Sequence, residues 1–169
     1  MKNTNFLITS LLILSCPCLQ AQSKWFVSPS TGIAVIDKKI KVGYNANITL
    51  GRYLCDFGAE GQNGRLRADI CAGYYYFPGN RVYSTAALFS ACGSSDKWYN
   101  STSLVFGMQK SENHSKCDFI IPIKMTFPYT AYRFNNKMCL GLDLGANLNL
   151  SDFKYRTICY LGLFLGIGM

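Results

Sequence analysis

Histidine, charged residues and long apolar runs are all scarce in this sequence. His114 is the only histidine among 169 residues, which argues against a zinc site. Charged residues amount to 15%, against about 25% in an ordinary soluble domain. No apolar run reaches the ~20 residues that a membrane-spanning helix needs. These shortages exclude a helical membrane protein, and we expect neither a metal nor a cofactor.

The N-terminal residues have the pattern of a secretory leader. Lys2 supplies the positive charge, residues 6–14 supply the apolar stretch, and Ala21 ends a plausible cleavage site. A lipoprotein signal at Cys16 is the rival interpretation, but the residues around it match that signal poorly. We therefore expect a signal peptide over residues 1–21 and a single exported domain over residues 22–169.

Alternation of apolar residues with polar or small ones is the strongest signal in the chain. Over residues 137–150 every even position is apolar, while the odd positions carry Lys, Cys, Gly, Asp and Asn. A period of two is typical of a β-strand with two different faces. The pattern recurs over residues 39–53, 67–77 and 160–169, with weaker copies over 25–36, 82–92, 98–109 and 117–129.

Short, turn-rich links separate these segments, which predicts an all-β, antiparallel up-and-down arrangement of about eight strands. Two features fit this arrangement less well. Pro122 and Pro128 lie inside the sixth segment, where a missing N–H predicts a bulge or a strand end. The link over residues 54–64 is long, so the strand count near the start could differ by one.

The composition of the second face distinguishes a soluble barrel from a membrane barrel. This face holds mainly Gly, Asn and Ser, which suit a narrow lumen, whereas a soluble barrel would place Lys, Glu and Thr there. About 13 steps of ~3.3 Å, tilted by ~45°, also cover the ~25 Å apolar band of a membrane. Aromatic residues near 74–77, 98–99, 127–132 and 153–155 predict interfacial girdles. The sequence therefore predicts a transmembrane β-barrel.

This pattern resembles the small eight-stranded outer-membrane β-barrel proteins of Gram-negative bacteria. The leader ending in Ala21-Gln22 is similar to leaders of the Bacteroidetes type. The resemblance covers nearly all of the chain after the leader. It implies an outer-membrane location, both termini in the periplasm, insertion by the barrel-assembly machinery and a lumen too narrow for a general pore.

Any Ser-His-acid catalysis would have to use His114, which lies in a polar stretch with Ser111 and Ser115. Outer-membrane lipid A deacylases use such a trio, but their serine follows the histidine after one intervening residue. Here Ser115 is adjacent to His114. We therefore interpret the stretch as a solvated loop and expect no catalytic residue.

Four charged residues fall on the expected lumenal face, and we interpret them as neutralising one another. They are Arg67, Asp69, Lys137 and Asp143. Removing the leader leaves 8 − 2 = 6 cysteines, an even number that permits disulfides without choosing the pairs. Cys71 and Cys139 share the lumenal face but belong to the third and seventh strands, too far apart for a disulfide. Leu144 faces lipid in this register, so Leu144→Arg should be costly and Gly145→Ser milder.

We therefore expect an integral outer-membrane β-barrel with a structural or surface-interaction role and no catalysis. The excess of 17 Lys and Arg over 9 Asp and Glu favours outer-membrane lipid and lipopolysaccharide as partners, besides the barrel-assembly machinery during insertion. The basic residues are scattered, which argues against nucleic acid. Two alternatives stay open: a secreted soluble β-barrel or sandwich that binds an apolar ligand, and a lipid-modifying outer-membrane barrel enzyme that uses His114.

Overall fold

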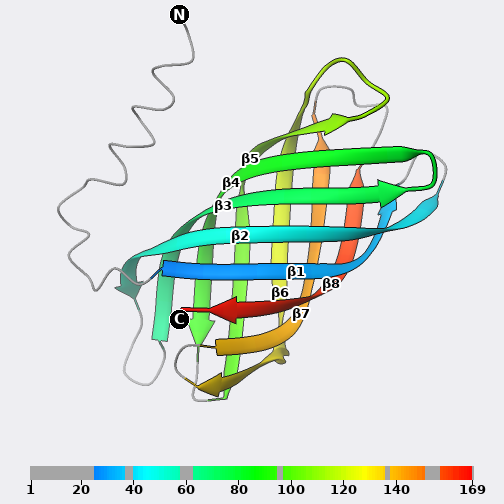
Figure 1. Cartoon of the computed structure of the whole chain (residues 1–169). Coiled ribbons are helices and arrows are strands. Elements are labelled where there is room, and N and C mark those ends of the chain that lie inside the picture. The colour runs from blue at the N-terminus through cyan, green and yellow to red at the C-terminus, as the bar shows by residue number, and fades with distance from the viewer. Residues whose placement is uncertain are drawn as a thin grey trace, which may run out of the picture.

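The computed structural model describes residues 25–36, 40–57, 63–94, 97–135, 138–150 and 157–168. These residues form a closed antiparallel barrel in which each strand pairs with the next and the last returns to the first (Figure 1). The strands are β1 (Trp25–Ile36), β2 (Lys41–Phe57), β3 (Asn63–Phe77), β4 (Asn80–Ser94), β5 (Trp98–Ser111), β6 (Asp118–Asn135), β7 (Met138–Asn149) and β8 (Ile158–Ile167). The predicted all-β, up-and-down fold is confirmed. The expected signal peptide over residues 1–21 lies outside the described residues.

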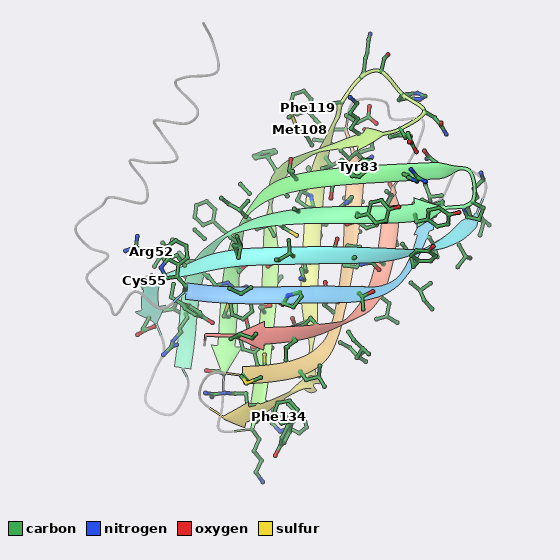
Figure 2. All side chains as sticks on the ribbon, viewed as in Figure 1. Arg52, Cys55, Tyr83, Met108, Phe119 and Phe134 are labelled. Carbon is green, nitrogen blue, oxygen red and sulfur yellow. The ribbon has the colours of Figure 1, made fainter. Side chains whose placement is uncertain are left out.

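The alternating sequence pattern decides which side chains point out of the barrel. In β7, Leu140 and Leu144 are exposed, while Cys139 and Asp143 between and beside them are buried. The same alternation leaves large apolar side chains on the outer face of every strand, as Met108 and Phe119 illustrate (Figure 2). No helix within the described residues is long and apolar enough to cross a membrane.

A tight hairpin joins β3 to β4 and fixes their register. Phe77 pairs with Asn80, so that Pro78 and Gly79 alone form the turn. Gly79 has a φ of 76°, a left-handed conformation in which a side chain would be strained. The turn after β5 lies beside this hairpin, because the Glu112 amide donates to the Arg81 carbonyl at 2.8 Å.

The expected long link over residues 54–64 is wrong, because most of it belongs to strands. β2 continues to Phe57, and β3 already begins at Asn63. A bulge makes this continuation possible: Tyr53 pairs with Arg67 but Cys55 pairs with Leu66, so Leu54 is the additional residue. The break in alternation after Tyr53 therefore marks a local shift of the period, and β2 ends only at Phe57.

The two prolines of β6 differ in their effect on the strand. Pro128 lies in the interval between Thr126 and Tyr132 where the register with β7 shifts, which confirms the expected bulge. For Pro122 the expectation is wrong, because this residue pairs with Asn147 without a shift of register. One missing N–H removes a single donor, and the pairing with β7 continues through Ile121 and Ile123 on either side of Pro122.

Side chains fill the lumen in three layers. We call the end where β1 begins and β8 ends the terminal end, and the opposite end the distal end (Figure 1). The terminal apolar layer consists of Phe26, Tyr53, Cys92, Tyr99, Ala131, Cys139 and Phe164. The distal apolar layer consists of Ala34, Ile36, Tyr75, Phe77, Val82, Ile158 and Tyr160. Between them lies a polar layer built around two ion pairs.

Candidate functional site

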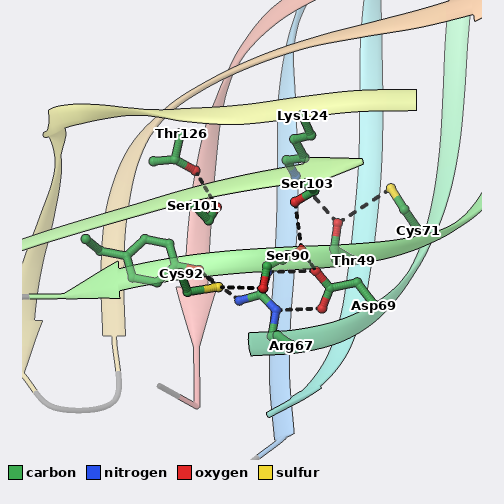
Figure 3. A network of polar contacts seen from close by, with 11 residues as sticks. Thr49, Arg67, Asp69, Cys71, Ser90, Cys92, Ser101, Ser103, Lys124 and Thr126 are labelled. Atoms are coloured by element: carbon green, nitrogen blue, oxygen red, sulfur yellow. Dashed lines mark hydrogen bonds and ion pairs between the residues drawn. The ribbon is translucent and has the colours of Figure 1, made fainter. Parts of the chain in front are cut away.

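The first ion pair of the polar layer joins Arg67 and Asp69 (Figure 3). They stand two residues apart on β3, so both point into the lumen. The Arg67 Nε donates to Asp69 Oδ1 at 2.5 Å and Nη2 donates to Oδ2 at 2.9 Å. Their side chains are only 4% and 1% exposed. This bidentate geometry offsets much of the cost of removing both charges from water.

Neighbouring strands extend this pair into a network. The Ser90 hydroxyl donates to Asp69 and lies 2.7 Å from the Ser103 hydroxyl, which connects β3 to β4 and β5. The Arg67 Nη1 donates to the Tyr99 hydroxyl at 2.8 Å. The guanidinium carbon also lies 3.7 Å from the centre of the Phe26 ring, within the range of a cation–π contact. Arg67 is thereby held against the terminal apolar layer.

The second ion pair joins Lys124 on β6 and Asp143 on β7, with 3.0 Å between Nζ and Oδ2. The Lys124 ammonium also donates to Thr49 on β2 at 3.5 Å. The sequence predicted a neutralised Asp143, but Lys124 was not among the expected partners, and Lys137 lies outside the described residues. The inward direction of Lys124 could have been predicted from the sequence, because Lys124 alternates with the outward apolar residues of β6.

A small cavity lies beside Arg67, Asp69 and Lys124 and is large enough for about one water molecule. Hydroxyl groups line much of it, including those of Ser28, Thr49, Ser101 and Ser103. The Ser101 and Thr126 hydroxyls lie 3.1 Å apart at its wall. The arrangement can hold water against paired charges. Among the described residues, no group of three or more His, Cys, Asp or Glu side chains could hold a metal ion.

Aromatic rings cover the polar layer on both sides. Towards the terminal end, the Tyr99 ring centre lies 6.2 Å from that of Phe26 and 6.3 Å from that of Phe164. Towards the distal end, the Tyr75 and Tyr160 ring centres lie 5.9 Å apart. All five side chains are buried. The polar layer is therefore an enclosed compartment and not a section of an open channel.

His114 lies in the exposed turn between β5 and β6. Its Nδ1 lies 3.0 Å from the carbonyl oxygen of Asn113. The Ser111 hydroxyl points into the barrel and donates to Asn80 Oδ1 at 2.7 Å, and Ser115 is exposed in the turn. The structure thus places the expected loop at the distal end and engages Ser111 with Asn80 rather than with His114.

The expected aromatic girdle is only partly outside the barrel. Tyr74 and Tyr76 point outward, but Tyr75 and Phe77 belong to the distal apolar layer. Trp98 and Tyr99 also lie on opposite faces, and Tyr99 is the one buried in the lumen. Assigning these inward residues to a girdle was wrong, because consecutive residues of a strand point to opposite faces. Residues 153–155 lie outside the described residues.

The cysteines are distributed over both faces of the barrel. All six cysteines of the described residues are free thiols. Cys71 and Cys139 point inward from β3 and β7, as predicted from the alternation. Cys55, Cys117 and Cys159 are exposed. The absence of a Cys71–Cys139 disulfide in the protein as it occurs in the cell stays a prediction.

Comparisons with known proteins show the fold of the chain. No family model matches it, and no curated protein matches it. Among solved structures, the outer membrane enzyme PagL is similar with a TM-score of 0.56 and 19% identity, over 85% of this chain and 99% of PagL. Neisserial surface protein A is similar with a TM-score of 0.64 and 10% identity, over 86% of this chain and 97% of that protein. The chain therefore has the β-barrel fold of outer-membrane proteins.

Proposed function

We propose that the protein is an integral outer-membrane barrel with a structural or surface-interaction role and no chemistry of its own. The observation that carries the proposal is the placement of apolar and charged side chains. Ile33, Ile70 and Phe106 are 61%, 67% and 66% exposed on the outer face. The charges of Arg67 and Asp69 are instead paired inside. This is the arrangement that a barrel surrounded by lipid requires.

The filled lumen supports a surface role over a pore. Two apolar layers enclose the polar layer, and the ion pairs inside it leave little charge to attract permeating ions. What the barrel can offer to partners is therefore its outer wall and the turns at its ends. The turn over residues 112–117, with His114, is the longest described turn at the distal end.

The two alternatives have less support. A soluble barrel would not leave large apolar side chains such as Ile33 and Ile70 exposed on its outer face, and an apolar ligand would meet an ion-paired network in the middle of this lumen. A lipid-modifying enzyme would need His114 within reach of a nucleophile, but Ser111 is engaged with Asn80. The similarity to PagL concerns the fold alone.

Membrane fractionation tests the proposal. The full chain is expressed in a Gram-negative host, and cell envelopes are washed with alkaline carbonate. We expect the protein to stay in the outer-membrane pellet, to dissolve in detergent, and to migrate faster on gels before boiling than after it. Release into the carbonate wash, the periplasm or the medium would contradict the proposal.

A further inference from the structure

Two neighbouring rows of register partners cross the outer face of β2 to β5 at the distal end. The row nearer the turns contains Tyr44, Tyr76, Arg81 and Glu112. The next row contains Ala46, Tyr74, Tyr83 and Lys110. We call the four tyrosines of these rows, together with Arg81 and Lys110, the basic tyrosine platform. Lipid faces this part of the wall if the proposed function is correct, and the inference below rests on that function.

The tyrosines of the platform form a packed aromatic surface. The ring centres of Tyr44 and Tyr76 lie 4.9 Å apart in a stacked arrangement. Those of Tyr74 and Tyr83 lie 5.5 Å apart. Tyr44 and Tyr83 are each about half exposed, and Figure 2 shows Tyr83 on the outside of the wall. Tyrosine combines an apolar ring with a polar hydroxyl, which suits the boundary between acyl chains and headgroups.

Each of the two cations of the platform is the register partner of one of its tyrosines on the neighbouring strand. Arg81 pairs with Tyr76, and Lys110 pairs with Tyr83. Arg81 Nη1 lies 3.5 Å from Glu112 Oε1, with both side chains about half exposed. An exposed pair at this distance contributes little, and a guanidinium has five N–H donors, so Arg81 keeps donors for another anion. The platform thus carries two cations, and the carboxylate of Glu112 lies beside it.

The rows below the platform are apolar except for Thr85. The next row towards the terminal end contains Ile48, Ala72, Thr85, Met108 and Phe119. The row after that contains Leu50, Ile70, Ala87 and Phe106. The platform therefore marks the level at which the outer wall changes from mainly apolar and uncharged to tyrosine-rich and basic. Acyl chains can lie along the lower rows while their headgroup reaches Arg81 and Lys110.

We propose that the basic tyrosine platform binds the phosphorylated headgroup of a membrane lipid. A guanidinium and an ammonium both bind phosphate through charge-assisted hydrogen bonds, and Arg81 can do so through two parallel N–H groups. The tyrosine rings supply the flat surface beside them, on which a sugar or glycerol part of the headgroup packs. The charge of the platform and the apolar rows below it thus match the two parts of one ligand.

Titration with lipid in detergent tests this inference. The folded barrel is titrated with bisphosphorylated lipid A and with its dephosphorylated form, and native mass spectrometry counts the bound lipid. The test variant is Arg81→Gln/Lys110→Gln. The matched control is Arg52→Gln/Lys97→Gln, which removes the same charge at the terminal end. A second variant, Arg81→Lys/Lys110→Arg, exchanges the two cations and keeps the charge.

We expect the native protein to bind the phosphorylated lipid more tightly, and Arg81→Gln/Lys110→Gln to weaken that binding about 30-fold, since each cation near an anionic headgroup contributes about fivefold. The control should change binding less than about twofold, and the exchange variant should retain it. Equal binding of both lipids by the native protein, or an equal loss in the control, would overturn the inference. Carbonate extraction of all variants distinguishes failure of this inference from failure of the proposed function. If only the lipid site is wrong, the protein stays in the membrane pellet; if the proposed function is wrong, carbonate releases it.

Discussion

Gly145 on β7 lies beneath the ring of its register partner Tyr160 on β8, and a methyl group at Gly145 would overlap the hydroxyl end of that ring. Tyr160 is buried in the distal apolar layer, so its ring has little room to move. A side chain at residue 145 therefore carries a steric cost that the sequence did not reveal, because the structure fills the space beside Gly145 with Tyr160. That Gly145→Ser is milder than Leu144→Arg stays a prediction.

Gly145→Ala should destabilise the barrel by about 1–3 kcal/mol, because an added carbon forces the Tyr160 ring from its position. Urea unfolding in lipid vesicles, followed by tryptophan fluorescence, measures the change. The same substitution in a Tyr160→Ala background should be nearly neutral, which makes the pair a double-mutant cycle. An unchanged penalty in that background would show that Gly145 is needed for a reason other than Tyr160.

Leu144→Arg should cost about 2–4 kcal/mol in the same unfolding assay, because the side chain points outward near the middle of β7. Leu144→Ala is the control, since it shortens the side chain at the same position without adding a charge. If both variants unfold at the same urea concentration, residue 144 does not face the apolar part of the membrane.

Asp69→Asn should destabilise the barrel by about 3–5 kcal/mol, because it leaves the guanidinium of Arg67 buried without a carboxylate. Replacing both residues, as Arg67→Met/Asp69→Leu, should recover much of this loss. The comparison uses the free energy of unfolding of the three proteins. A double variant less stable than Asp69→Asn would mean that the pair itself supplies net stability.

Purified protein in planar bilayers should show no stepwise ion conductance, because an apolar layer closes the lumen at each end of the polar layer. A general porin in the same bilayers is the positive control. Regular conductance steps from the native protein, with a size that scales with salt concentration, would contradict an enclosed lumen.

His114→Ala should leave membrane insertion and cellular lipid A unchanged. The residue lies in an exposed turn, and the nearby Ser111 hydroxyl is bound to Asn80. Mass spectrometry of lipid A from cells that express either protein is the measurement. Loss of an acyl chain with the native protein alone would establish His114 as part of a catalytic site.

The sequence predicted the facing of residues better than their partners. Alternation assigned Leu144 outward and Asp143 inward correctly, because lipid and lumen impose different side chains on the two faces. It could not pair Asp143 with Lys124, since that contact depends on the register between β6 and β7. The bulge after Tyr53 could not be predicted either, because one additional residue interrupts the alternation in the same way as the start of a loop does.

The basic tyrosine platform shows the same limit. The run of aromatic residues over 74–77 was visible in the sequence, and alternation divides it between the two faces, but the residues beside it on neighbouring strands were not visible. The proximity of Tyr83 and Lys110 depends on the pairing of β4 with β5. A local pattern specifies the face on which a residue lies, whereas its neighbours across the wall are set by the whole ladder.

Pairing of β1 with β8 makes assembly of the barrel depend on both the first and the last strand of the chain. The pairs of β1 with β8, from Val27 with Ile167 to Ile36 with Ile158, join the first and last strands, whereas the other pairings of the closed ladder join consecutive strands. A chain that still lacks β8 would expose the edges of β1 and β7 to lipid, at a cost of several kcal/mol for each unpaired backbone group. We therefore expect membrane entry to wait until the last strand is available. Contacts between distant segments form slowly, so this closing seam is where we expect the rate of folding to be determined.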